Sequence, residues 1–120
     1  MIERLKADFI FNDERGTLTQ LIHTGFSQIN VITSKAGIIR GGHYHELNKE
    51  AFYIIQGKCL VTASRDGKTE SCVFEAGDMF QISEYVIHDF EYLEDTVLVS
   101  MYSRGVELGD GKMDIITPNR

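Results

Sequence analysis

Short apolar runs separated by glycine, acidic and small polar residues recur along the whole chain. Residues 28–33 alternate polar and β-branched apolar side chains, which is typical of a half-buried strand. No window sustains the i, i+3, i+4, i+7 spacing of an amphipathic helix. Many short strands at nearly regular spacing predict an all-β sandwich or barrel. Further strands are expected at residues 17–22, 50–55, 58–64, 69–74, 79–82, 86–92 and 96–102.

Three segments lie outside the core that we expect at about residues 17–103. Residues 1–11 are apolar but irregular, and they form either an edge strand or an arm that packs on a second subunit. Residues 12–16, Asn-Asp-Glu-Arg-Gly, have the composition of a turn. Residues 104–120 contain several glycines and the lone proline, so we expect a loosely attached tail with residues 113–116 as a candidate edge strand.

The two cysteines flank a predicted hairpin whose tip is Asp66-Gly67. A two-residue turn there would pair Cys59 with Phe74 and Val61 with Cys72. The thiols would then be diagonal neighbours at roughly 7–8 Å, which is too far for an unstrained disulfide. We expect both cysteines to be reduced.

The composition indicates one domain, because 120 residues with 42% apolar content suffice for a single core. A net charge of -6 and the lack of any basic run argue against a nucleic-acid partner. The apolar runs are well short of the ~20 residues that span a bilayer, and residues 1–4 do not open a secretory signal. A cytoplasmic protein without a membrane partner is expected.

The candidate chemistry lies in residues 37–57, between two turn glycines. Side chains two apart on a strand share a face, so His43 and His45 can meet one ion. Glu50 opens the next apolar run, and His88 lies on a predicted inward face downstream. A histidine on an apolar strand is more often a core residue than a ligand. Four such groups buried together, however, would cost several kcal/mol each without a counter-charge.

A divalent cation is the simplest compensation for such a cluster. Three imidazoles and one carboxylate suit zinc, iron, manganese, nickel or cobalt. The fourth histidine, His23, is expected to be an ordinary, partly exposed side chain.

The motif spacing resembles the cupin superfamily. Its first motif is matched at every term, by Gly37, His43, His45, Glu50 and Gly57. This resemblance implies a single-domain jelly-roll β-barrel with His43, His45, Glu50 and His88 as the metal ligands. The second motif is half kept: Gly77 and His88 match, while its proline, second glycine and asparagine are replaced by Ser83, Tyr85 and Tyr92.

Residues 13–16, 26–30 and 37–44 resemble nucleotide-sugar cupins, notably the dTDP-4-dehydrorhamnose 3,5-epimerases. In that family the histidine at His43 is the base, and arginines such as the one at Arg40 bind the diphosphate. That family has glutamine at His45, and its catalytic tyrosine aligns near Val99.

The cupin domain of capsular-polysaccharide biosynthesis enzymes fits better, through its Arg-Gly-x-His-Tyr-His-x4-Glu run. Those domains bear a metal and epimerise a UDP-linked 4-keto-6-deoxy sugar. The sugar-nucleotide 3,4-ketoisomerases are a third relative, and they typically have glutamine near Glu50.

These resemblances imply an epimerase or isomerase of a nucleotide-linked 4-keto-6-deoxy sugar in polysaccharide biosynthesis. A histidine that coordinates a metal cannot accept a proton. Either the metal is catalytic and another residue is the base, or His43 works without a metal. Tyr53, Tyr92 and Tyr102 are candidates for the missing acid or base.

Two alternatives remain open. The first is that the chain is a non-catalytic module that binds a metal or a carbohydrate. The second is that it is another metal-dependent cupin enzyme, such as a dioxygenase. In either case we expect a homodimer, because small jelly rolls leave sheet edges exposed and the apolar residues 5–11 need a surface to cover.

Overall fold

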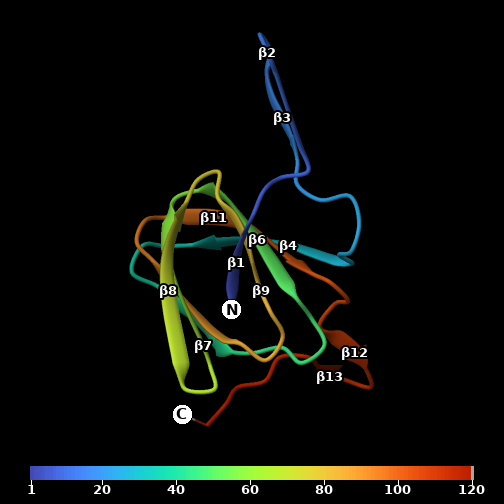
Figure 1. The fold of residues 1–120 in the computed structure, drawn as a ribbon, viewed down its shortest axis with the longest axis vertical. Coiled ribbons are helices and arrows are strands. Elements are labelled where there is room, and N and C mark those ends of the chain that lie inside the picture. The colour runs from blue at the N-terminus through green and yellow to red at the C-terminus, as the bar shows by residue number, and fades with distance from the viewer. Residues whose placement is uncertain (120) are drawn as a thin grey trace.

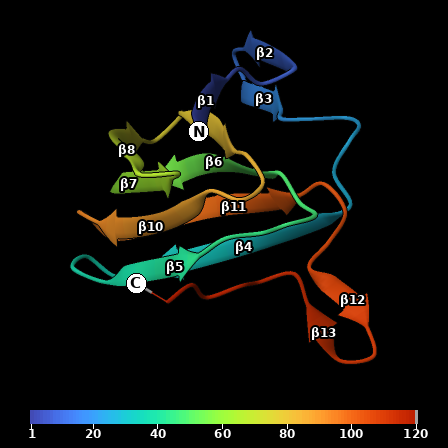
Figure 2. The ribbon, with the colours of Figure 1, turned by 60° about the horizontal axis from the view of Figure 1, so that its bottom comes forward.

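The protein consists of two antiparallel sheets that face each other, as a computed structural model of the chain shows for residues 1–119 (Figure 1). Within these residues there are strands and turns but no helix, so the predicted all-β jelly roll is confirmed. In Figure 2 the strands of one sheet run behind those of the other. The two sheets are not hydrogen-bonded to each other in the described chain, so the structure is a sandwich rather than a closed barrel.

The five-stranded sheet has the order β1 (Ile2–Leu5), β9 (Met79–Ile82), β6 (Glu50–Gln56), β11 (Thr96–Tyr102) and β4 (Gln28–Ser34). The four-stranded sheet has the order β5 (Ile39–His43), β10 (Ile87–Tyr92), β7 (Lys58–Arg65) and β8 (Lys68–Glu75). Two separate hairpins are formed by β2 (Phe9–Asp13) with β3 (Gly16–Gln20), and by β12 (Glu107–Gly109) with β13 (Lys112–Met113).

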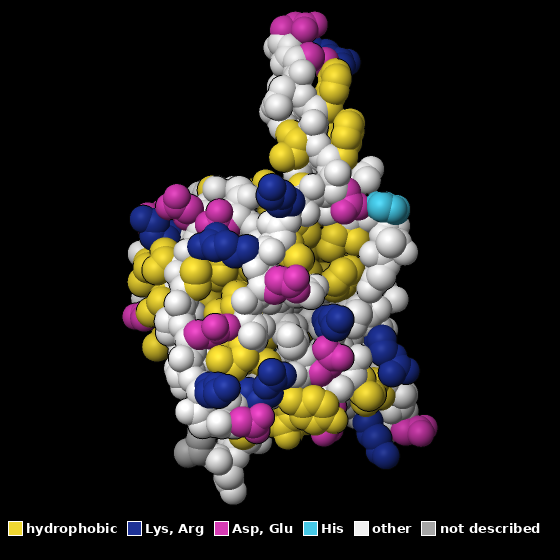
Figure 3. Space-filling view, in the orientation of Figure 1, with side chains coloured by type: hydrophobic (Ala, Val, Ile, Leu, Met, Phe, Trp, Pro, Cys, Tyr) yellow, Lys and Arg dark blue, Asp and Glu magenta, His cyan; other side chains and the backbone are white. Residues whose placement is uncertain are grey.

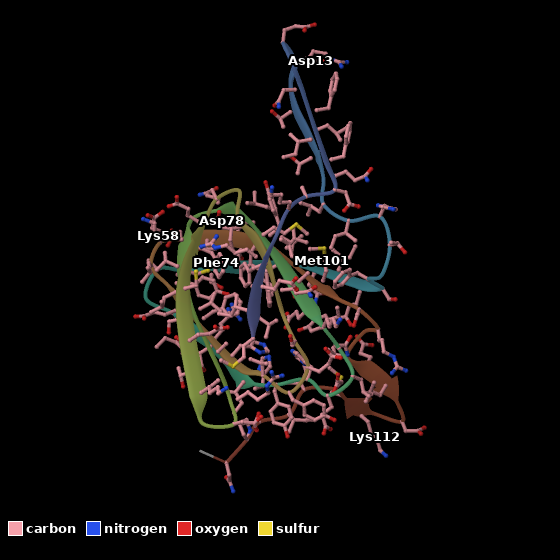
Figure 4. The ribbon with its side chains drawn as sticks, in the orientation of Figure 1. Asp13, Lys58, Phe74, Asp78, Met101 and Lys112 are labelled. Carbon is pink, nitrogen blue, oxygen red and sulfur yellow. The ribbon has the colours of Figure 1, made fainter. Side chains whose placement is uncertain are left out.

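The core fills the space between the two sheets with alternate side chains of each strand. On β6, Phe52 and Ile54 point inward with Glu50, as the sequence pattern predicts. Phe74, labelled in Figure 4, stacks on Phe80 with 3.8 Å between ring centroids. This apolar packing adjoins a group of buried polar side chains that includes His45, Glu50 and His88.

The β7–β8 hairpin has the predicted register, with Cys59 opposite Phe74 and Val61 opposite Cys72. Both cysteines are free thiols, as expected. Burial raises the pKa of Cys59 to about 12, so this thiol stays protonated.

Residues 1–11 are expected to form either an edge strand or an arm, and the edge strand is found for the first part of this segment only. β1 is an edge strand of the five-stranded sheet and pairs with β9. Residues 9–20 form a hairpin that projects from the body, with Asp13 at its tip (Figures 1 and 4). The predicted turn at residues 12–16 is therefore the hairpin end. The predicted strand at 17–22 belongs to this hairpin and not to the two large sheets, which are formed by β1 and by strands from β4 onward.

The C-terminal segment also differs from the expected loose tail. Val106 and Asp114 are buried, and the backbones of Tyr44 and Ile116 exchange two hydrogen bonds of 3.0 Å. The segment is therefore packed against the end of β5. Residue 120, the last of the predicted tail, lies outside the described residues. Residues 1–119 contain no helix that is long and apolar enough to cross a membrane.

Candidate active site

Three histidines and one glutamate meet between the sheets, at the end of the interior that the apolar core does not fill. His43 on β5 lies directly opposite His88 on β10. His45 follows the end of β5, and Glu50 is the first residue of β6. The three imidazole centroids are 4.8 to 5.2 Å apart, and one ring nitrogen of each lies within 4.8 Å of the others. The strands β5, β6 and β10 thus bring together the four side chains that the sequence suggested.

Glu50 is the hub of this cluster and is almost completely buried. Its Oε1 lies 3.0 Å from His45 Nε2 and 3.4 Å from His88 Nε2, and its Oε2 accepts a 2.6 Å hydrogen bond from Ser100 Oγ. Burial alone would raise the pKa of Glu50, but the hydrogen bonds from His45 and His88 lower it to about 2. Glu50 is therefore an ionised carboxylate at neutral pH.

Two of the three imidazoles are held by backbone carbonyls. His45 Nδ1 donates to Asp114 O at 2.6 Å, and His88 Nδ1 donates to Val86 O at 3.0 Å. A bond at Nδ1 fixes the ring and directs Nε2 toward Glu50, which is how metal-binding histidines are usually oriented. Burial would lower the pKa of His45, but its hydrogen bonds with Glu50 and the Asp114 carbonyl raise it above the ordinary value.

His43 differs from the other two. Within residues 1–119, neither of its ring nitrogens has a hydrogen bond. Burial and the neighbouring rings of His88 and His45 lower the pKa of His43 to about 4. At neutral pH this imidazole is uncharged, and it carries a lone pair that no group of the described chain occupies.

The cluster faces a partly open cavity of about 370 Å³. Its volume lies near the lower end of the range for small-molecule sites, roughly 300–1,000 Å³. One wall is apolar and consists of Ile32, Phe52, Phe90 and Leu98. The polar lining comprises six of the side chains singled out from the sequence: Arg40, His43, Glu50, His88, Tyr92 and Tyr102.

Arg40 lies at the rim of the cavity and is exposed. Its Nε donates to Ser34 Oγ at 2.8 Å, so the side chain reaches from β5 to β4 across the open edge of the sandwich. Tyr92 also interacts with Ser34, and burial raises its pKa despite that hydrogen bond. The cavity therefore has a cationic rim beside a phenol.

Tyr102 lies at the opposite, histidine end, with its ring centroid 5.2 Å from that of His45. Burial and the adjacent Glu50 raise the pKa of Tyr102. Since both cavity tyrosines have raised pKa values, each holds its proton at neutral pH and neither is suited to act as a base.

The third tyrosine does not belong to the site. Tyr53 lies on the other face of β6, where it packs with Ala51, Met79 and Met101 outside the sandwich. Tyr53 therefore cannot serve as the acid or base of this cavity. His23 is exposed near the base of the β2–β3 hairpin, where its Nδ1 contacts the Asp8 carboxylate, and it does not line the cavity.

The residue Tyr85 has a strained backbone and is hydrogen-bonded to the backbone of His45. Tyr85 occupies the position where the second cupin motif has glycine, and it adopts the left-handed conformation with φ of +64°. For a bulky side chain this conformation is unusual and unfavourable. Its amide donates to His45 O at 2.7 Å, and its ring stacks on Tyr44 with 6.1 Å between centroids.

Two supporting residues were not found from the sequence, namely Ser100 and Asp114. Ser100 is an inward position of β11, two residues before Tyr102, so strand alternation offered a signal for it. Asp114 lies 69 residues after His45 in the sequence and meets it only in the folded chain, so no local sequence pattern indicates its role.

Residues 11–104 match the polysaccharide biosynthesis C-terminal domain family, which covers most of the chain. The chain belongs to this family. A second similarity is to the UDP-2-acetamido-2,6-beta-L-arabino-hexul-4-ose reductase of Pseudomonas aeruginosa, at 40% identity over 47 residues. This match covers 38% of the present chain and only 13% of the reductase.

Solved structures with the same fold include 3,4-ketoisomerases of nucleotide sugars. The TDP-quinovose 3,4-ketoisomerase WlaRB of Campylobacter jejuni has a TM-score of 0.81 at 14% identity, covering 98% of this family member and 92% of WlaRB. QdtA of Thermoanaerobacterium thermosaccharolyticum, in complex with TDP, has a TM-score of 0.80 at 16% identity, with 98% and 88% covered. The rmlC epimerase of Mycobacterium tuberculosis has a TM-score of 0.67 at 20% identity, with 82% and 61% covered. The resemblance to nucleotide-sugar cupins is thereby confirmed for the fold.

Proposed function

We propose that this chain moves a proton next to the keto group of a nucleotide-linked 4-keto-6-deoxy sugar, as an epimerase or isomerase in polysaccharide biosynthesis. The observation that carries the proposal is the state of His43. Its imidazole is uncharged, lines the cavity and has no hydrogen bond within the described chain. An uncharged imidazole in reach of a ligand has the protonation state that a general base requires.

The shape of the cavity supports a sugar ring inside and a nucleotide outside. Its volume of about 370 Å³ is small, and the exposed Arg40 lies at its rim. A guanidinium at that place can pair with a diphosphate while the sugar reaches His43. The TDP bound to QdtA and the UDP sugar in the name of the reductase support a nucleotide as the carrier.

One divalent transition metal is part of the proposal, and the residues present fit it. His45 and His88 are both held at Nδ1 with Nε2 toward the carboxylate of Glu50. Two anchored imidazoles and a carboxylate are a common ligand set for zinc and for iron, and manganese, cobalt and nickel accept similar donors. A bound ion would supply Lewis-acid stabilisation of negative charge on the keto oxygen.

This assignment gives different roles to the four residues that the sequence suggested as ligands. Only the ring of His43 lacks an anchoring hydrogen bond, so we place three ligands at His45, His88 and Glu50 and keep His43 as the base. The conflict between ligand and base at His43 then disappears. Tyr92 and Tyr102 hold their protons and serve as hydrogen-bond donors to the sugar or to Glu50.

A homodimer is also proposed, because two apolar surfaces of the protein lack a cover. On the β2–β3 hairpin, Phe9, Phe11 and Leu18 share one face and are about half exposed. On the outer face of β4, Ile29 and Val31 are each about two-thirds exposed. Figure 3 shows hydrophobic side chains along the projecting hairpin, with charged ones at its tip. A two-stranded hairpin is marginally stable by itself, so a second copy of the chain is the natural cover.

The catalytic proposal is tested by incubating UDP- and dTDP-linked 4-keto-6-deoxy hexoses with the protein in heavy water. Deuterium should enter at C3, or at C3 and C5, before any net conversion. His43→Ala should abolish the exchange while keeping the metal, and Arg40→Ala should mainly raise KM. His23→Ala is the control, because this histidine lies outside the cavity, and it should exchange at the normal rate.

Metal analysis of the same variants tests the ligand assignment. His45→Ala and His88→Ala should lose the ion, whereas His43→Ala should retain it. If neither sugar exchanges above the buffer rate while the metal stays bound, the chain is a binding module rather than an enzyme.

A further inference from the structure

Asp114 of the C-terminal segment is deeply buried, with only 2% of its surface exposed. Its carboxylate accepts three hydrogen bonds from one loop. Oδ1 accepts from the backbone amide of Glu46 at 2.8 Å, and Oδ2 accepts from the amide of Leu47 at 2.9 Å and from Asn48 Nδ2 at 2.7 Å. This loop joins His45 to Glu50, so Asp114 fixes the connection between two residues of the site.

The same residue also contacts the site directly. The backbone carbonyl of Asp114 accepts the 2.6 Å hydrogen bond from His45 Nδ1. The side chain of Asp114 therefore binds the loop after His45, while its main-chain carbonyl binds the His45 ring. Because the carboxylate is tied to the loop after His45, the carbonyl is held in register with the imidazole.

Asn48 ties the start of the C-terminal segment to the same loop. This side chain is fully buried, and its Oδ1 accepts from the amides of Arg104 and Gly105 at 2.9 Å each. Its Nδ2 donates to Gly105 O at 3.0 Å as well as to Asp114. Both ends of the segment from Gly105 to Asp114 are thus hydrogen-bonded to the loop between His45 and Glu50.

We propose that Asp114 is a positioning residue that sets the orientation of the His45 ring, and that the C-terminal segment is thereby a working part of the active site. With Nδ1–H donated to the Asp114 carbonyl, Nε2 is the nitrogen that faces Glu50. Partners of this kind orient metal-binding histidines, and their loss typically weakens metal affinity by about 10- to 100-fold. The metal part of this inference rests on the proposed function; the ring orientation does not.

The test compares Asp114→Ala and Asp114→Asn with Asp110→Ala. Asp110 is a matched control, because it is an exposed aspartate of the same segment, in the turn between β12 and β13. In the metal-free protein, nitrogen-detected NMR would follow the Nδ1 proton of His45 and its exchange with water. Zinc titration would give the Kd of each variant.

In the native protein and in Asp110→Ala, the His45 Nδ1 proton should exchange slowly. Asp114→Ala should make this exchange fast and weaken zinc binding by about 10- to 100-fold. Asp114→Asn should have an intermediate effect, since one amide oxygen still accepts a hydrogen bond from the loop while the NH₂ group opposes the other donors.

The proposal is overturned if Asp114→Ala lowers the melting temperature but leaves the His45 proton protected and the zinc Kd within about twofold of the native value. Should Asp114→Ala fail to fold, Asp114→Asn decides by the same two measurements. If the native protein binds no zinc, the proposed metal site is lost. The exchange of the His45 proton would still decide the role of Asp114.

Discussion

Ser100 donates a hydrogen bond of 2.6 Å from Oγ to Oε2 of Glu50, and both residues are buried between the sheets. The bond occupies one carboxylate oxygen and leaves the other, Oε1, to the imidazoles of His45 and His88. A hydroxyl on β11 therefore determines which oxygen of a carboxylate on β6 faces the proposed metal.

Ser100→Ala is expected to loosen Glu50. Removing the hydroxyl leaves Oε2 without that donor, which should cost about 1–3 kcal/mol of stability and weaken zinc binding by about 10-fold or more. The pKa of Glu50 should rise above its value of about 2. Urea unfolding, zinc titration and carbon-detected NMR of the Glu50 carboxyl would measure the three effects in turn. Ser64→Ala on β7 is the control, and equal zinc affinities for the two variants would contradict the role of Ser100.

The stability of the metal-free protein should fall as the pH drops from about 6.5 to 4, because of His43. An unfolded imidazole has a pKa near 6.5, whereas that of His43 is about 4 in the folded chain. Between these values the unfolded state binds a proton that the folded state does not, so protonation favours unfolding. The lowered pKa of Glu50 acts in a more acidic window, below its ordinary value of about 4.5 and down to about 2.

Urea unfolding at several pH values would measure this dependence. His43→Gln keeps a side chain of similar size without a titrating ring, so its stability should change less between about pH 6.5 and 4. An unchanged slope in this variant would show that His43 does not titrate as described.

The two glycines that bound the central motif should respond differently to alanine. Gly37 and Gly57 both have positive φ, at +87° and +98°, so each substitution should cost about 1–2 kcal/mol in backbone strain. A Cβ on Gly57 would also lie 2.5 Å from Asp95 O, whereas a Cβ on Gly37 would have no non-neighbouring atom of the described residues within 4 Å. Thermal unfolding should show Gly57→Ala to be less stable than Gly37→Ala by about 1–3 kcal/mol. Equal losses would mean that the β6–β7 turn can move away from Asp95.

Leu18→Glu should dissociate the proposed homodimer. Leu18 is 57% exposed on the apolar face of the hairpin, so a charge there should disturb a dimer contact without harming the fold of one chain. Light scattering on a sizing column should show a dimer for the native protein and a monomer for the variant. Thr17→Glu is the matched control on the opposite hairpin face. A native protein that is monomeric at high micromolar concentration would contradict the proposal.

Strand alternation and turn chemistry predicted the parts of the fold that depend on local pattern. The register of the β7–β8 hairpin followed from one Asp-Gly turn, and the inward side of β6 followed from the spacing of Glu50, Phe52 and Ile54. The histidine cluster was predictable for the same reason, because residues two apart share a face.

Other features depend on contacts between distant segments, which a single sequence does not encode locally. Asp114 is buried by a loop 66 to 68 residues earlier in the chain. Two apolar residues of β4, Ile29 and Val31, also face outward, because the polar Gln28 and Asn30 take inward positions beside Ile32. Hydrophobicity alone would assign that strand the opposite orientation.

The left-handed backbone at Tyr85 has a consequence for how sequences of this kind can vary. The fold requires a backbone shape at this position so that the amide reaches His45 O, and glycine is only the easiest residue to adopt it. A chain that accepts about 1–2 kcal/mol of strain gains a side chain there, in this case a ring that stacks on Tyr44. A sequence search that requires glycine at this position of the second motif would miss such a chain, although its backbone has the same conformation there.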